Sequence, residues 1–135
     1  MIGLVVVTHS HMAAEMIRTA EMIIGPFSAA AAVSIDRGMA VETAKAQLAE
    51  AISRVGSDGD GVLILTDMFG GTPTNISAEF LANPGVEILT GINLPMLLKA
   101  VTARSGQTVN GLTGLLKDYA RNAVMRPSEL LKPAH

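Results

Sequence analysis

The first apolar run of the chain, residues 2–8, is the feature that most constrains its fold. The run contains three consecutive valines and no charged residue. It is too short for an ordinary helix and is typical of a strand that is covered on both faces of a parallel sheet. From residue 12 to residue 24 apolar residues recur at helical spacing, and Gly25 and Pro26 then end the segment. A buried strand followed by an amphipathic helix predicts an α/β fold.

The same alternation continues along the chain. Further strands are predicted at residues 31–35, 62–66 and 86–89, and further helices at residues 40–55, 73–81, 95–103 and 108–119. Strands that alternate with helices predict a parallel sheet with right-handed crossovers. We therefore expect one doubly wound domain over residues 1–135, with helices on both faces of the sheet. The tail has little periodicity, and a short edge strand is expected there at residues 123–125.

Composition and charge exclude several classes of protein. The hydrophobic content of 49% argues against disorder. With 10 basic and 12 acidic residues and no block of one sign, the chain lacks the basic face that a nucleic-acid partner requires. It contains no cysteine, which excludes disulfides and thiolate metal sites. The first apolar run is too short for a membrane helix and follows no basic residue, so we expect a cytoplasmic protein without membrane insertion.

Two polar residues follow the strands at residues 2–8 and 62–66. His9 ends the first of these runs, and Asp67 comes directly after the second. Parallel strands place their carboxyl ends at one edge of the sheet, where open α/β folds bind their ligands. If the strand order is 2-1-3-4, these two strands are central neighbours and the two side chains flank the point where the chain reverses direction. We therefore expect His9 and Asp67 to meet there.

A histidine in this position is suited to accepting a phosphoryl group. A neutral imidazole has a free nucleophilic nitrogen, and a carboxylate on its other nitrogen fixes the tautomer. A helix that begins at Ser10 or His11 would direct its free N–H groups toward the phosphoryl oxygens. The loop 70–72, which is Gly-Gly-Thr, offers a second set of N–H groups and a hydroxyl, and Thr72 is a candidate cap for the next helix. No metal or other cofactor is required, because phosphoryl transfer depends mainly on positioning and charge stabilisation.

Each residue also has an ordinary structural interpretation. His9 alone could be a surface residue or a helix cap, and Asp67 alone could be a turn residue. The loop 70–72 could be a simple turn, and Asn93 could either line the same crevice or stabilise its own turn. Thr8 and Thr66 fit structural roles better than catalytic ones. A further alternative is a metal site formed by His9, His11 and Asp67, as in a hydrolase.

Three segments together carry a resemblance to a known family: residues 5–9 (VVVTH), 63–75 (LILTDMFGGTPTN) and 90–97 (TGINLPML). The chain resembles the enzyme IIA (EIIA) component of the mannose family in the bacterial sugar phosphotransferase system (PTS). The resemblance covers residues 1 to about 125. It implies a doubly wound domain with parallel strand order 2-1-3-4. It also implies a homodimer in which residues 122–128 form a strand that crosses to the sheet of the partner.

The resemblance also implies a reaction. His9 would accept a phosphoryl group from the phosphohistidine of HPr and pass it to a histidine of a IIB component, which acts with the membrane components IIC and IID in sugar uptake. Asp67 would be the carboxylate partner of His9, and Thr72 the hydroxyl near the phosphate, where the family often has serine. Two related alternatives stay open. One is a stand-alone regulatory module controlled by phosphorylation of His9. The other is the phosphocarrier subunit of a dihydroxyacetone kinase system.

Overall fold

The computed structural model describes residues 1–131 and contains one four-stranded parallel sheet with the strand order β2-β1-β3-β4. The strands are β1 (Gly3–His9), β2 (Ala30–Ile35), β3 (Val62–Thr66) and β4 (Val86–Leu89). All four strands were predicted, and their order agrees with the order implied by the family resemblance. The doubly wound α/β fold is therefore confirmed.

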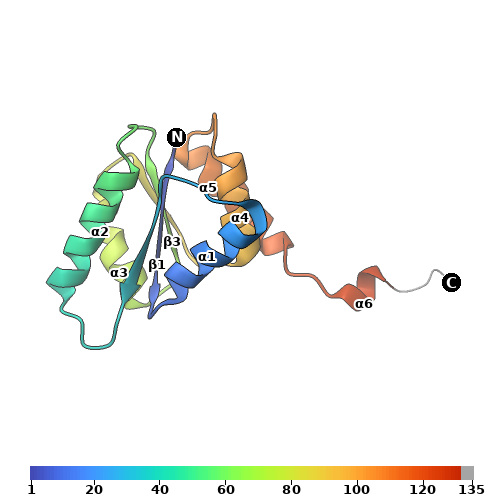
Figure 1. Ribbon diagram of the computed structural model, residues 1–135, viewed down its shortest axis with the longest axis horizontal. Coiled ribbons are helices and arrows are strands. Elements are labelled where there is room, and N and C mark those ends of the chain that lie inside the picture. Colours follow the sequence, from blue (N-terminus) through green and yellow to red (C-terminus); the bar gives the residue numbers. More distant parts are fainter. Residues whose placement is uncertain (132–135) are drawn as a thin grey trace.

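The helices form a layer on each face of the sheet (Figure 1). One layer contains α2 (Val41–Val55) and α3 (Thr72–Ala78), which continues into the short 3₁₀ helix η1 (Glu79–Ala82). The other layer contains α1 (Met12–Ile24), α4 (Leu94–Ala103) and α5 (Val109–Asn122). None of the helices described in residues 1–131 combines the length and the apolar character needed to span a bilayer.

The apolar run in β1 is continuous because both of its faces are covered. Leu4 and Val6 belong to the core under α1, α4 and α5, whereas Val5 and Val7 belong to the core under α2 and α3. All four side chains are fully buried. This is the pattern expected for a central strand of a parallel sheet, and it places the carboxyl end of β1 in the middle of one sheet edge.

Helix ends agree with the sequence in most places. The side chains of Asn93 and Thr108 cap α4 and α5, accepting hydrogen bonds from the amides of Met96 at 2.9 Å and Gly111 at 3.0 Å. The helix predicted at residues 73–81 is α-helical only as far as Ala78. Its last turn tightens into η1 before Asn83, which is consistent with the Pro84 that follows.

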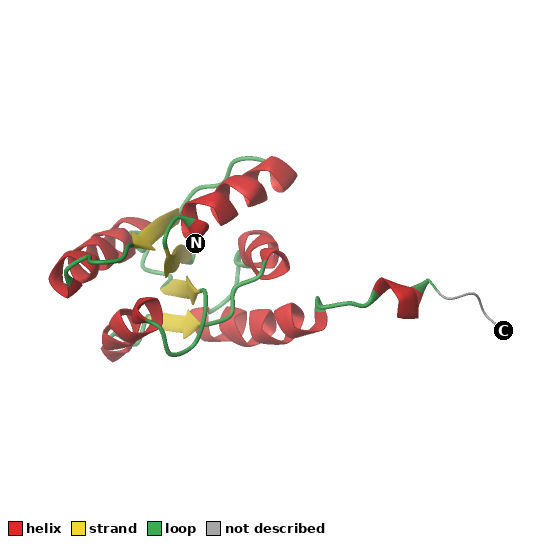
Figure 2. Ribbon diagram, turned by 90° about the horizontal axis from the view of Figure 1, so that it is seen from below, coloured by secondary structure: helices red, strands yellow, loops and turns green. Residues whose placement is uncertain are grey.

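The C-terminal segment differs from the prediction. Residues 123–126 form no strand in this single chain, and Pro127–Leu130 is a one-turn helix, α6. This segment leads away from the body of the molecule (Figure 2). A strand needs the free edge of another strand for its hydrogen bonds, and proline at a first helical position favours a helical turn instead. Exchange of a C-terminal strand between subunits requires a second chain and stays a prediction. Residues 132–135 of the tail lie outside the part of the chain that the structure describes.

Candidate functional site

The register of the sheet brings His9 and Asp67 together. His9 is the last residue of β1, and Val7, two residues before it, pairs with Thr66 at the end of β3. Asp67 follows Thr66 directly, so both side chains lie at the same edge. This is the meeting of β1 and β3 that the sequence predicted for the point where the chain reverses direction.

The contact between the two side chains is direct. Nδ1 of His9 lies 2.7 Å from Oδ2 of Asp67, and the amide of His9 donates to the same oxygen at 2.9 Å. A carboxylate only accepts hydrogen bonds, so Nδ1 is the donor, and in the neutral ring Nε2 then holds the lone pair. The side chain of His9 is 50% exposed, whereas that of Asp67 is only 12% exposed. The pair therefore holds an oriented imidazole at the surface on a carboxylate that is only slightly exposed.

The environment keeps Asp67 in its charged form. Burial by itself would raise the pKa of this carboxyl group, but the hydrogen bonds from the amide and ring of His9 outweigh burial and hold the pKa below its ordinary value. The carboxylate is thus charged at neutral pH. A negative charge beside Nδ1 favours the positive ring that forms when Nε2 gains a phosphoryl group.

Gly71 packs against the imidazole. A Cβ atom at this position would lie 2.8 Å from Cε1 and 3.3 Å from Nε2 of His9, closer than a side chain tolerates. Gly70 has a φ of +91°, a conformation that favours glycine. Gly71 itself occupies the cap position of α3, and Thr72 is the first residue of that helix. The prediction that Thr72 caps the helix is therefore wrong, and its side chain lines the cavity beside His9 instead.

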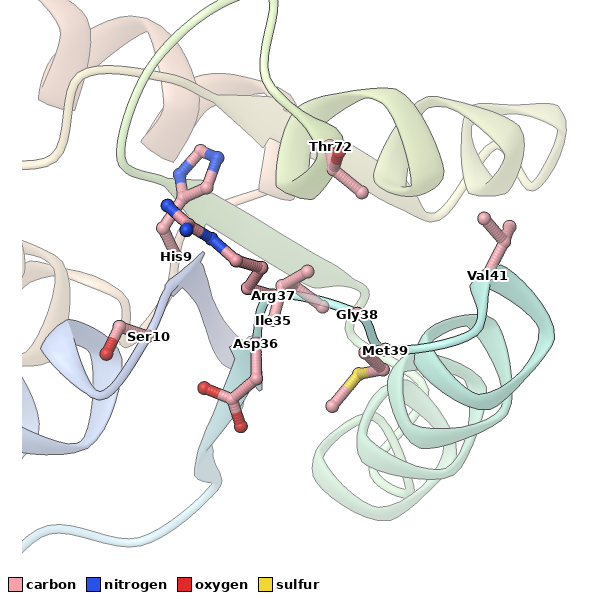
Figure 3. A pocket seen from close by; sticks show the side chains of 9 residues that line it. All are labelled: His9, Ser10, Ile35, Asp36, Arg37, Gly38, Met39, Val41 and Thr72. Atoms are coloured by element: carbon pink, nitrogen blue, oxygen red, sulfur yellow. The ribbon is translucent and has the colours of Figure 1, made fainter.

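Ser10 differs from its predicted role. The helix begins at Met12 rather than at Ser10 or His11, and Ser10 adopts a left-handed conformation with a φ of +54°. Its amide already donates to the carbonyl oxygen of Ile35 at 3.0 Å. Its hydroxyl points away from the ring of His9 (Figure 3). Ser10 lines the cavity, but its amide is not free for a ligand.

Three other polar residues near the strand ends have structural contacts. The hydroxyl of Thr8 accepts a hydrogen bond from the amide of Ala13 at 2.8 Å, which occupies one N–H group at the start of α1. Thr66 shares a hydrogen bond of 2.7 Å with Thr74 in α3. The side chain of Asn93 donates to the carbonyl oxygen of Ala120 at 3.1 Å, in addition to capping α4. Of the two interpretations of Asn93, the structure favours stabilisation of its own turn.

The alternative metal site has no structural support. Within residues 1–131, no group of three or more histidine, cysteine, aspartate or glutamate side chains is placed so that it could hold a metal ion. His11 is the residue before α1. His9 directs Nδ1 to Asp67, so the three residues do not form one ligand set.

A cavity of about 660 Å³ opens beside His9. It lies between the ends of β1 and β2 and the starts of α2 and α3, and Figure 3 shows the side chains that line it. One of them, Arg37, was not singled out from the sequence. Arg37 lines the same cavity as His9, and its side chain extends in the direction of His9 in this view. The rule that found His9 and Asp67, polar residues just after a strand, also applies to Arg37, which is two residues beyond β2.

Comparison with known proteins assigns the chain to a family. The family model named EIIA-man and described as "PTS system fructose IIA component" matches residues 3–115. The chain belongs to this EIIA family. It is therefore a component of the sugar phosphotransferase system with a phosphotransferase role, as the three sequence segments predicted.

Individual relatives agree with this assignment. The fructose-specific EIIA component of Bacillus subtilis is 28% identical over 98% of this chain and 90% of its own length. The mannose-specific EIIAB component of Escherichia coli K12 is 27% identical over 98% of this chain, which spans 43% of that longer protein. A crystal structure of the EIIA component from Streptococcus agalactiae superposes with a TM-score of 0.84, at 26% identity, over 96% of this EIIA chain and 99% of that one.

Proposed function

We propose that this EIIA protein carries a phosphoryl group on Nε2 of His9, taking it from phospho-HPr and passing it to a histidine of a IIB component. The observation that carries the proposal is the 2.7 Å contact between Nδ1 of His9 and Asp67 on a ring that is half exposed. This contact fixes the proton on Nδ1, leaving Nε2 as an accessible nucleophile without a separate general base.

The transfer is a balanced exchange of one bond for another. The lone pair of Nε2 forms the new N–P bond while the P–N bond of the donor breaks, and the donor nitrogen keeps that electron pair. No proton needs to leave His9, because Nδ1–H stays on the side of Asp67. The ring becomes positively charged, and the carboxylate of Asp67 at 2.7 Å stabilises that charge. Transfer to the IIB histidine reverses these steps.

The proposal assigns binding of the phosphoryl oxygens to the loop 70–72. Gly71 lies against the ring of His9. The described hydrogen bonds within residues 1–131 include none donated by the amides of Gly71 or Thr72. Free N–H groups beside the nucleophile suit an anion, and the Thr72 hydroxyl supplies one more donor. We assign Gly70, Gly71 and Thr72 to phosphate binding on this basis.

Exposed apolar side chains near the site favour a protein as donor and acceptor. Met68 and Phe69, which directly follow Asp67, are 53% and 82% exposed. Met12, at the start of α1, is 44% exposed. Exposed apolar groups that surround a reactive centre are typical of surfaces that dock another protein. HPr and a IIB component, coupled to membrane components IIC and IID, are the proposed partners in sugar uptake.

The assembly proposed is a homodimer joined by the C-terminal segment. Val124 and Met125 are 80% and 64% exposed in the single chain, which suits a segment that packs against a second copy. Deletion of residues 122–135 should shift the protein from dimer to monomer in sedimentation velocity. A deletion variant that sediments like the full chain would contradict a dimer joined by the C-terminal segment.

The phosphoryl-carrier proposal is tested by labelling. The protein is incubated with labelled phosphoenolpyruvate, enzyme I and HPr, and we expect one acid-labile phosphoryl group per chain. His9→Gln should abolish the label completely. His11→Gln is the matched control, because it removes a neighbouring exposed histidine and should leave labelling intact. Labelling of the His9→Gln protein would overturn the assignment of the nucleophile.

A further inference from the structure

Arg37 lines the cavity next to His9 and carries a positive charge. The proposed transfer of the phosphoryl group gives this charge no role. The mechanism uses Asp67, an anion, to stabilise the imidazole, but a phosphoryl group on Nε2 adds further negative charge at the mouth of the cavity. Among the cavity-lining residues in the described chain, Arg37 is the one lysine or arginine. The phosphoryl group therefore has one candidate cation within this cavity.

The fold places Arg37 close to the ring through the strand register. His9 pairs with Ile35, the last residue of β2, so the chain after Ile35 runs directly beside the end of β1. A tight turn follows, in which the amide of Met39 donates to the carbonyl oxygen of Asp36 at 3.1 Å, and Gly38 has a φ of +82°. Arg37 is the second residue of this turn. Its side chain extends toward His9, whereas the carboxylate of Asp36 points away from the ring (Figure 3).

The guanidinium of Arg37 is available for a ligand. Within residues 1–131 it takes part in no ion pair, although most of the other described arginines do: Arg18, Arg54 and Arg126 pair with glutamates. The planar, positively charged guanidinium matches two phosphoryl oxygens at once. An unpaired arginine that points into a cavity next to a nucleophile is suited to an anion.

We propose that Arg37 binds the phosphoryl group on His9 and stabilises the phosphorylated form of this EIIA protein. The proposal rests on the proposed carrier function. The N–P bond forms and breaks as described above, and Arg37 exchanges no proton and forms no covalent bond. Its guanidinium donates hydrogen bonds to two oxygens of the phosphoryl group. Arg37 thereby shifts the equilibrium of phosphoryl exchange toward this protein.

The test measures the equilibrium constant for exchange of the phosphoryl group between HPr and this protein. The two are mixed after phosphoenolpyruvate and enzyme I have been removed, and the phosphorylated fraction of each is determined. This constant compares free proteins, so the strength of docking cancels and a change reports on the phosphoryl group itself. Arg37→Gln should lower the constant roughly 3- to 10-fold, the range for a partly exposed charge-assisted contact.

Two further variants distinguish a direct contact between Arg37 and the phosphoryl group from an effect of the overall charge of the protein. Arg37→Lys keeps the charge without the planar fork and should recover part of the loss. Arg54→Gln makes the same substitution near the far end of α2, where Arg54 pairs with Glu50 at 3.3 Å, and should leave the constant unchanged. Equal constants for the wild type and Arg37→Gln, with His9 labelled in both, would overturn this inference alone. A wild-type protein that accepts no label would instead overturn the carrier function.

Discussion

The two ends of the sheet each hold a charged side chain with little exposure, and they use it differently. At the amino end, Arg104 is 3% exposed and donates to the carbonyl oxygens of Ile2, Ala29 and Ser28 at 2.6–3.2 Å. At the carboxyl end, Asp67 accepts hydrogen bonds from the amide and ring of His9. Arg104 joins main-chain segments that are distant in sequence, whereas Asp67 holds a side chain that is half exposed.

The difference shows how a buried charge serves the fold or the function. The partners of Arg104 are main-chain oxygens, so its contacts contribute only to stability. The partner of Asp67 is a half-exposed imidazole with a second ring nitrogen, so this contact also orients a reactive atom. Three substitutions and one change of pH test this difference between the two ends of the sheet.

Asp67→Asn should slow phosphorylation of His9 on the order of 100-fold, because the neutral amide no longer stabilises a positive ring. The free energy of unfolding should change by less than about 1 kcal/mol, since an amide of the same shape still fills the site. Labelling rates at a fixed HPr concentration and urea denaturation measure the two quantities. Asp58→Asn, at the amino end of the sheet, is the control and should be phosphorylated at the wild-type rate. An equally fast Asp67→Asn protein would contradict the role of the carboxylate.

Arg104→Met should show the opposite pattern. Loss of the guanidinium removes three hydrogen bonds to main-chain oxygens, which should lower the free energy of unfolding by about 2 kcal/mol. The labelling rate of the folded protein should not change. Arg18→Met is the control: Arg18 forms an exposed pair with Glu15, and its loss should cost less than about 0.5 kcal/mol. Slower labelling of Arg104→Met would show that the two ends of the sheet are coupled.

Gly71→Ala should slow phosphorylation about 10-fold, as expected when a nucleophile moves by a fraction of an ångström. The new methyl group would lie 2.8 Å from Cε1 of His9 and displace the ring. Nitrogen NMR of the imidazole should then show a weakened bond from Nδ1 to Asp67. Gly114→Ala in α5 is the control, because no atom lies near its added Cβ. If the imidazole NMR signals and the phosphorylation rate of Gly71→Ala equal those of the wild type, close packing of Gly71 on His9 does not position the ring.

Acid should produce the smallest effect. The folded protein holds the pKa of Asp67 below its ordinary value of 3.8, so the folded state binds this proton less readily than the unfolded chain. The contribution of Asp67 to stability is thus fully present above that ordinary value and is lost as the pH falls through the lowered pKa. The difference in unfolding free energy between the wild type and Asp67→Asn should shrink from about pH 5 to about pH 2. A difference that stays constant over this range would contradict the lowered pKa.

The sequence predicted the sheet well because the main strands have clear physical patterns. The run at residues 2–8 must be covered on both faces, and the spacing of Ala44, Leu48, Ala51 and Val55 produces one apolar face on α2. Secondary structure was predicted less well where the local sequence pattern favours one conformation and the surrounding structure favours another. Residues 123–125 have the composition of an edge strand but lack a strand to pair with in the single chain, and Thr72 precedes a proline like a cap but lies inside the helix.

Local sequence patterns were enough to predict the succession of strands and helices along the chain and the positions of His9 and Asp67 after two strands, because periodicity and strand-end position are local properties. The tertiary structure decided which atoms meet. The register between β1 and β3 brings Oδ2 of Asp67 to Nδ1 of His9, although the two residues are 58 positions apart in the chain. The packing of Gly71 on the ring and the direction of Arg37 depend on distances between segments far apart in the chain, and no local pattern encodes such distances.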